Sequence, residues 1–138
     1  MTEYDHQYTG TLPVLPVADV RDALAFFVQR LGFEQVFVQE DRGVLANAQV
    51  QMDGCHLMLN HNPERSGERA GGVYFWIRVR DQPIDELYRR HADGGVRIAE
   101  EIADQFWGDR SYVAQDANGF MIAFTQAASC AVRRKKSG

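Results

Sequence analysis

The sequence predicts an α+β fold built from two βαβββ modules, and three observations support this prediction. The first is length, because 138 residues provide one domain with a sizeable core. The second is a repeated helix signal: Asp19 precedes an apolar-periodic segment that reaches Gly32, and Asp81 precedes another that reaches Gly94 at the same spacing. The third is a repeated hairpin signal, in which Gly54 and Gly119 each precede an apolar run. One such unit cannot bury both faces of its sheet, so the two units must share a core.

The first module is expected to span residues 11–62. An apolar segment at 12–17 contains two prolines, which suit an edge strand. Asp19 is expected to cap a helix, because apolar residues follow at i, i+3 and i+4 spacing from Val20 to Leu31 and Gly32 can end it. Strands are then expected at residues 33–38, 44–52 and 55–60.

The second module is expected to span residues 72–126. A strand at 73–79 leads to a helix capped by Asp81, with Pro83 in its first turn and Gly94-Gly95 at its end. Further strands are expected at 96–99, 111–114 and 120–124, and a loop at 104–109 carries Trp107. The domain therefore covers 11–126, between an N-terminal arm at 1–10 and a basic tail at 127–138 that is expected to be disordered.

Charge is distributed unevenly along the chain. Its net charge is −4, but the tail contributes four basic residues after position 131, so the body has 11 basic and 19 acidic residues, a net charge of −8. Such a body argues against nucleic-acid binding and favours a cationic ligand.

Hydropathy and cysteine content indicate the cellular compartment in which the protein is expected. The apolar runs are shorter than a membrane span and the first ten residues are polar, so neither a membrane helix nor a signal peptide is expected. The two cysteines, Cys55 and Cys130, are interpreted as free thiols of a reducing compartment, which makes the protein cytoplasmic.

Six short motifs carry a family resemblance when they are taken in order. They are Pro16–Val20, Ala25–Phe27, Leu31–Phe33, Asp85–Tyr88, Trp107-Gly108 and Asp116–Gly119. From about Leu12 to Gln126 the chain resembles the vicinal oxygen chelate superfamily, which includes glyoxalase I, fosfomycin resistance enzymes, ring-cleaving dioxygenases and bleomycin resistance proteins. The likeness is strongest to the bleomycin resistance proteins, through Phe75–Arg78 together with Trp107-Gly108. This resemblance implies curved mixed sheets around a cup, a homodimer and a ligand in a cleft between the two chains.

The resemblance also bears on catalysis, because the superfamily's enzymes hold a divalent metal with His, Gln or Glu. Those positions fall at or near Leu12, Gly72 and Ala123, none of which can donate to a metal. No metal or other cofactor is therefore expected. No catalytic residue is identified either, since Cys55 and His56 are adjacent and point to opposite faces of a strand.

Aromatic residues provide the positive evidence for a site. If Gly72 marks the cup side, strand alternation places Tyr74, Trp76 and Arg78 on that side. The resemblance places Trp107 where a flat ligand is stacked, and Phe37 on the facing wall. The expected ligand-binding residues are Trp107, Trp76, Tyr74, Arg78, Phe37 and Tyr112, with the face of Tyr112 left open. The alternative is that these rings only fill a core.

Three functions are compatible with these observations. The missing metal ligands, the aromatic cup and the acidic body favour a non-enzymatic homodimer that sequesters a flat or cationic small molecule of antibiotic type. One alternative is a metal-dependent glyoxalase-like lyase or dioxygenase whose ligands stand elsewhere. Another is a ligand-free pairing module. Against drug binding, Arg42 or Gly43 stands where some bleomycin-binding proteins have a second stacking aromatic, and Ala25 stands at an acidic position of the first helix.

Overall fold

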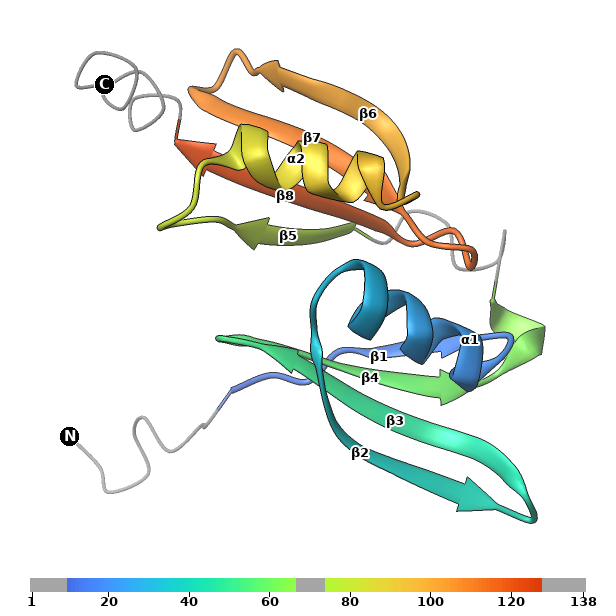
Figure 1. Ribbon diagram of the computed structural model, residues 1–138. Helices are drawn as coiled ribbons and strands as arrows, with labels where there is room; N and C mark the ends of the chain where they lie inside the picture. Colours follow the sequence, from blue (N-terminus) through green and yellow to red (C-terminus); the bar gives the residue numbers. More distant parts are fainter. Residues whose placement is uncertain (1–9, 67–73, 128–138) are drawn as a thin grey trace, which may run out of the picture.

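The fold consists of two βαβββ modules, as the sequence repeat predicts (Figure 1). The computed structural model describes residues 10–66 and 74–127; residues 1–9, Gly72, Val73, Cys130 and the basic tail from residue 128 lie outside the described residues. Module one contains β1 (Val14–Val17), α1 (Val20–Ala25), η1 (Phe26–Arg30), β2 (Glu34–Asp41), β3 (Val44–Met52) and β4 (Cys55–His61), followed by the short helix η2 (Pro63–Arg65). Module two contains β5 (Tyr74–Arg78), α2 (Ile84–Asp93), β6 (Arg97–Asp104), β7 (Asp109–Gln115) and β8 (Met121–Ala127).

Each module forms one mixed four-stranded sheet. The strand orders are β1-β4-β3-β2 and β5-β8-β7-β6. In both sheets the first and last strands of the module pair in parallel, and the other pairs are antiparallel. The same topology therefore occurs twice, and it places the last strand of each module between its first and third strands.

Every predicted strand is present, and the largest difference in extent is in β6. The run expected at 96–99 continues to Asp104, because pairing with β7 extends past the apolar residues into Glu100 and Glu101. A polar edge strand has no alternation of apolar residues, so the pattern alone ended it too early.

The first helix begins as predicted but ends with a wider turn. The Asp19 side chain accepts a hydrogen bond from the Asp22 N–H at 3.0 Å, which is an N-cap contact. From Phe26 to Arg30 the chain forms a π-helical turn, in which the Leu31 N–H donates to the Phe26 carbonyl. This turn buries Phe27 between the rings of Phe26 and Phe33, each 5.4 Å from it between ring centroids.

The cap predicted for the second helix was wrong. Asp81 does not cap α2; the helix starts at Ile84 after Pro83, and the side chain of Gln126 in β8 occupies its N-terminus. The Gln126 amide oxygen accepts from the Ile84 N–H at 3.3 Å, and its nitrogen donates to the carbonyl of Gln82 at 2.9 Å. A residue far along the chain thus replaces the local cap, which no short-range motif could reveal.

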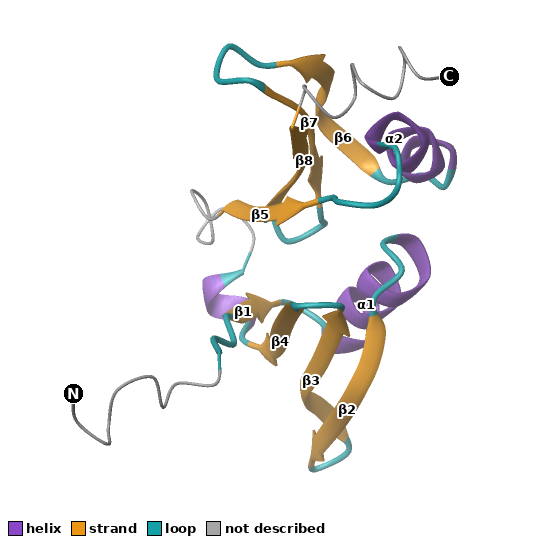
Figure 2. Cartoon of the chain, turned by 90° about the vertical axis from the view of Figure 1, so that its left-hand side faces the viewer, coloured by secondary structure: helices purple, strands orange, loops and turns teal. Residues whose placement is uncertain are grey.

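Both helices pack on the same side of the molecule, and the opposite faces of the two sheets are turned the other way (Figure 2). We call the sheet face opposite the helix the outer face. The helix-covered faces contain the core, which includes the fully buried side chains of Phe27, Phe33, Phe120 and Phe124.

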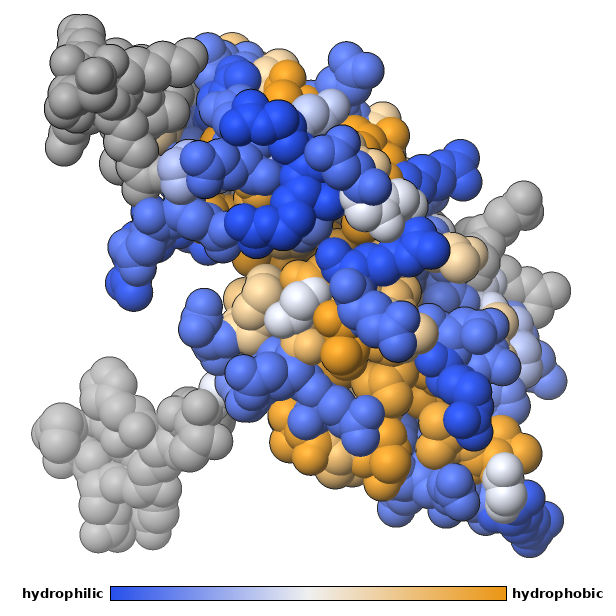
Figure 3. Space-filling model, in the orientation of Figure 1, coloured by the Kyte–Doolittle hydropathy of each residue, from blue (hydrophilic) through white to orange (hydrophobic). Residues whose placement is uncertain are grey.

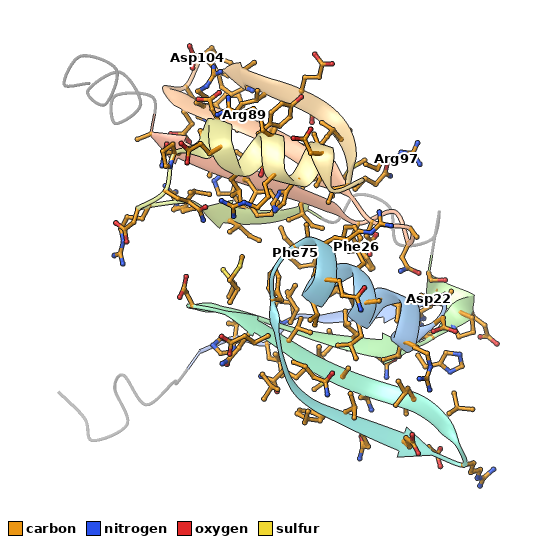
Figure 4. All side chains as sticks on the ribbon, viewed as in Figure 1. Asp22, Phe26, Phe75, Arg89, Arg97 and Asp104 are labelled. Carbon is orange, nitrogen blue, oxygen red and sulfur yellow. The ribbon has the colours of Figure 1, made fainter. Side chains whose placement is uncertain are left out.

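The two modules meet on the helix side. The Ala18 N–H donates to Asn118 Oδ1 at 3.0 Å, and Arg30 Nη1 donates to the Gly95 carbonyl at 2.8 Å. Phe26, which is partly buried, lies on the boundary between the modules (Figure 4). These contacts leave both outer faces accessible.

Hydrophobic side chains are unevenly distributed over the surface. On the face shown in Figure 3, they gather over module one, whereas the part around α2 is mainly hydrophilic. Exposed apolar residues of β2 include Val36, Phe37 and Val38, which are 45%, 39% and 41% exposed.

Within residues 10–66 and 74–127, no helix is long and apolar enough to cross a membrane.

Candidate ligand-binding site

The outer face of module two carries large, partly exposed aromatic side chains. In β5, Ile77 is buried and Phe75 is partly buried against the ring of Phe120, whereas Tyr74 and Trp76 are 53% and 47% exposed. Strand alternation places Arg78 on the same outer face, and it is exposed. The expected register of β5 is therefore the register of the structure.

A hollow of about 190 Å³ lies on this outer face. It is bordered by Tyr74, Trp76, Glu100, Gln105, Trp107, Ser111, Tyr112, Val113 and Ala123. The rings of Trp76 and Trp107 form one side, with 6.2 Å between their centroids and a 44° angle between their planes. Two tilted indoles with about half of their surface exposed form an open aromatic wall rather than a sealed core. Arg78 shares the face but does not border the hollow.

Trp107 is held at the rim by a tight turn between β6 and β7. The Gln105 N–H donates to the Asp109 carbonyl at 2.6 Å, and the Gly108 N–H donates to the Gln105 carbonyl at 3.1 Å. Gly108 has a φ of +98°, which favours glycine there. The Trp107 indole N–H donates to Asp109 Oδ2 at 3.2 Å, so the ring's polar edge is satisfied while its faces stay accessible.

The base of this turn is fastened to α2 by Arg110. Its Nη2 contacts Asp85 Oδ1 at 2.8 Å, and its Nη1 contacts Asp104 Oδ1 at 3.1 Å. Asp104 lies at the end of module two that is remote from module one (Figure 4). Arg110 therefore positions the Trp107 turn from the helix side of the sheet.

The same turn exposes Phe106, which is not among the ligand-binding residues expected from the sequence. Its side chain is 97% exposed, and its ring meets Trp107 edge-on with 4.9 Å between the centroids. Phe106 does not border the hollow. It extends the aromatic surface from Trp107 outward.

Glu100 is a second residue of this face that is not among those expected from the sequence. It pairs with Val113 across β6 and β7, and a register shift between Ile98 and Glu100 precedes that pair. The extra residue lets Glu100 take the outer face, where it borders the hollow. No local sequence signal marks this irregularity.

Without the register shift, Ala99 rather than Glu100 would stand opposite Val113. The shift therefore exchanges a methyl group for a carboxylate on the outer face, and it does so on an edge strand. Bulges of this kind often re-aim side chains next to binding sites. The hollow thus combines two indole faces with one acidic group.

Tyr112 has a different place from the one expected of a stacking residue. It borders the hollow, but its ring lies on the helix side of the sheet and is only 1% exposed. Its hydroxyl is 2.8 Å from His91 Nδ1, and its ring centroid is 5.0 Å from that of Tyr88. A side chain in this position cannot stack on a ligand in the hollow.

His91 is buried in the same cluster and is 2% exposed. Burial, with a smaller effect from the nearby charge of Arg90, lowers the pKa of His91 to about 4. Burial also raises the pKa of Tyr112. Both groups are therefore neutral at physiological pH, and they pack on the helix-covered face of the sheet.

Phe37 lies on the outer face of module one and does not border the hollow of its own chain. It pairs with Gln49, which pairs with Met58, which in turn pairs with Val14 at the sheet edge. Phe37 and Val14 are 39% and 59% exposed. Phe37 therefore cannot form the facing wall of the hollow within one chain. It could do so only if the outer face of module one from a second copy lay against the hollow.

Of the side chains around the hollow, only Glu100 and Gln105 are of the types with which the superfamily's enzymes hold a metal. Ala123 borders the hollow, as expected of a ligand position, but offers only a methyl group, and Leu12 is a partly exposed apolar residue. Within residues 10–66 and 74–127, no three His, Cys, Asp or Glu side chains are grouped to hold a metal ion. With two such side chains at the hollow rather than three, no reaction step is assigned to a metal.

Cys55 was considered as a nucleophile from the sequence, and it lies within the described residues. Burial, with a smaller effect from the charge of Asp53, raises the pKa of its thiol. The thiol is thus disfavoured as a thiolate nucleophile.

Comparison with known proteins agrees with this architecture. Residues 8–124 match the model of the Glyoxalase/Bleomycin resistance protein/Dioxygenase superfamily. A bleomycin resistance protein of Geobacillus stearothermophilus is 27% identical over 127 residues, covering 84% of this chain and 95% of that protein.

Two solved structures share the fold at similar identity. One is the bleomycin-binding protein from bleomycin-producing Streptomyces verticillus, complexed with copper(II)-bleomycin: its TM-score is 0.67 at 26% identity, covering 88% of this chain and 98% of the other. The other is TioX from Micromonospora sp. ML1, with a TM-score of 0.72 at 25% identity, covering 87% and 99% of the two chains.

The fold and the open aromatic hollow define a paired-module βαβββ protein with a candidate binding face on its second sheet. With the family match over most of its length, the chain belongs to the Glyoxalase/Bleomycin resistance protein/Dioxygenase superfamily. The resemblance inferred from the six sequence motifs is thereby confirmed.

Proposed function

We propose that this protein binds and sequesters a flat, cationic small molecule of antibiotic type and performs no chemistry on it. The observation that carries the proposal is the pair of half-exposed indoles, Trp76 and Trp107, at a hollow that Glu100 also borders. A cation over an indole face is attracted by about 0.5–2 kcal/mol, and a nearby carboxylate adds to that attraction. The similarity to bleomycin resistance and bleomycin-binding proteins supports the same type of ligand.

The proposal includes a homodimer, because one chain supplies only part of a pocket. The hollow of about 190 Å³ is smaller than the roughly 300–1,000 Å³ typical of drug-sized pockets. The outer face of module one, with Phe37, Met58 and Val14, is accessible and suited to face it from a second copy. In a twofold dimer each chain would offer both surfaces, so two equivalent pockets would form.

A thermal-shift screen with bleomycin and other flat cationic antibiotics tests the binding function. A compound at 100 times its Kd should raise the free energy of unfolding by about 2.7 kcal/mol. Isothermal titration should then give one site per chain, and mass spectrometry of the recovered compound should show it unchanged. A modified compound, or stoichiometric divalent metal in protein purified without chelator, would contradict the proposal.

A further inference from the structure

The acidic and the aromatic side chains lie at different positions around the hollow and the turn beside it. On the edge strand β6, the register shift brings Glu100 to the outer face opposite Val113. At the turn that follows β6, Trp107 stands at the rim and Phe106 lies outside the hollow. The acidic group and the aromatic groups therefore come from different parts of the rim.

The turn that follows β6 is preorganised rather than loosely exposed. Two backbone hydrogen bonds close the turn, the Trp107 indole is bonded to Asp109, and Arg110 ties the base of the turn to α2. Phe106 is thus held 97% exposed by a braced turn. A large apolar side chain presented in this way favours contact with another molecule.

From this arrangement, and resting on the proposed function, we infer that the ligand is elongated, with a basic group at one end only of the part that enters the hollow. That basic group lies against Glu100, and the flat body leaves the hollow across Trp107 and reaches Phe106. Glu100 sets the required charge, and Phe106 sets the preference for length. Both side chains are exposed, so a substitution at either can change the ligand preference without opening the core.

Two cationic probes of different length test this inference. Benzamidine has a single ring and can occupy only the hollow, whereas 6-amidino-2-phenylindole is a longer flat monocation that can also reach Phe106. Their Kd values are measured by titration against the wild-type protein and the variants Glu100→Gln, Glu101→Gln and Phe106→Ala. Glu101 is the matched control, because it is an adjacent acid of β6 that does not border the hollow.

The expected losses differ between the variants. Glu100→Gln should weaken both probes about tenfold or more, while Glu101→Gln changes either by less than about threefold. Phe106→Ala should weaken 6-amidino-2-phenylindole about threefold or more and leave benzamidine nearly unchanged, since only the longer probe reaches that ring.

Three results would overturn the inference. Equal losses in the two glutamate variants would mean that only the overall field of the protein attracts cations. Equal effects of Phe106→Ala on the two probes, or no effect on 6-amidino-2-phenylindole, would remove the assigned role of length. If neither probe binds the wild-type protein, the inference falls, while the antibiotic screen still decides the proposed function separately.

Discussion

Phe37 and Glu100 occupy equivalent positions in the two modules, and each stands on the outer face of its sheet after a register shift in an edge strand. In module one, the residues paired across the sheet from Phe37 are Gln49, Met58 and Val14. In module two, the residues paired across the sheet from Glu100 are Val113, Ala123 and Trp76. Module one therefore presents an aromatic ring where module two presents a carboxylate. Two facing rows of this kind would offer a ligand one apolar and one acidic contact.

Trp107→Ala should weaken binding of the compound selected by the antibiotic screen by about tenfold or more, a loss of at least ~1.4 kcal/mol. It should change the free energy of unfolding by less than about 1 kcal/mol, because the ring is 48% exposed and leaves no sealed cavity. Titration and urea denaturation of the same variant measure both. A stability loss of roughly 3–5 kcal/mol with unchanged affinity would instead identify Trp107 as a core residue.

The stability of the protein should fall as the pH is lowered from about 6.5 towards 4. His91 is neutral in the fold because its pKa is lowered to about 4, so in this range the unfolded chain binds a proton that the folded chain does not. The contribution of His91 is therefore complete above its unfolded pKa and is lost as the pH falls, by up to about 3 kcal/mol.

Urea midpoints between pH 4 and pH 7 measure this dependence. In His91→Phe the part of the slope due to His91 should disappear, whereas His61→Phe, at an exposed position, should keep it. A wild-type slope that survives His91→Phe would assign the effect to other groups.

Gln126→Leu should destabilise the protein by about 1–3 kcal/mol, because it leaves the Ile84 N–H and the Gln82 carbonyl without their partner. Asp81→Ala should stay within about 0.5 kcal/mol, since its carboxylate does not cap α2 and its contact with Arg80 is exposed. Denaturation of the two variants side by side provides the comparison. A larger effect of Asp81→Ala would restore the cap that the sequence pattern predicted.

The protein should sediment as a dimer at micromolar concentration, and Phe37→Glu should shift it towards the monomer by placing a charge on the outer face of module one. Arg89→Glu on α2, also exposed, is the matched control and should leave the dimer intact. Sedimentation equilibrium distinguishes the two states. A monomeric wild-type protein would refute the shared pocket.

Local patterns were enough to predict only some parts of the fold. Asp19 formed its cap and β3 has the expected bounds, because turn chemistry and apolar periodicity act over a few residues. The Gln126 cap and the outward position of Glu100 were missed because each depends on a partner strand. Tyr112 was placed among the ligand contacts although its ring lies beneath the sheet, since the face of β7 follows from its register with β8.

The parallel strand pairs have a consequence for how the chain folds. Val14 pairs with Met58 and Tyr74 with Met121, so the first strand of each module pairs only with the last strand of that module. Because that partner also lies inside the sheet, neither sheet can grow strand by strand in chain order. Each module should therefore fold as a unit, at the slower rates typical of high contact order, with its first strand docking late.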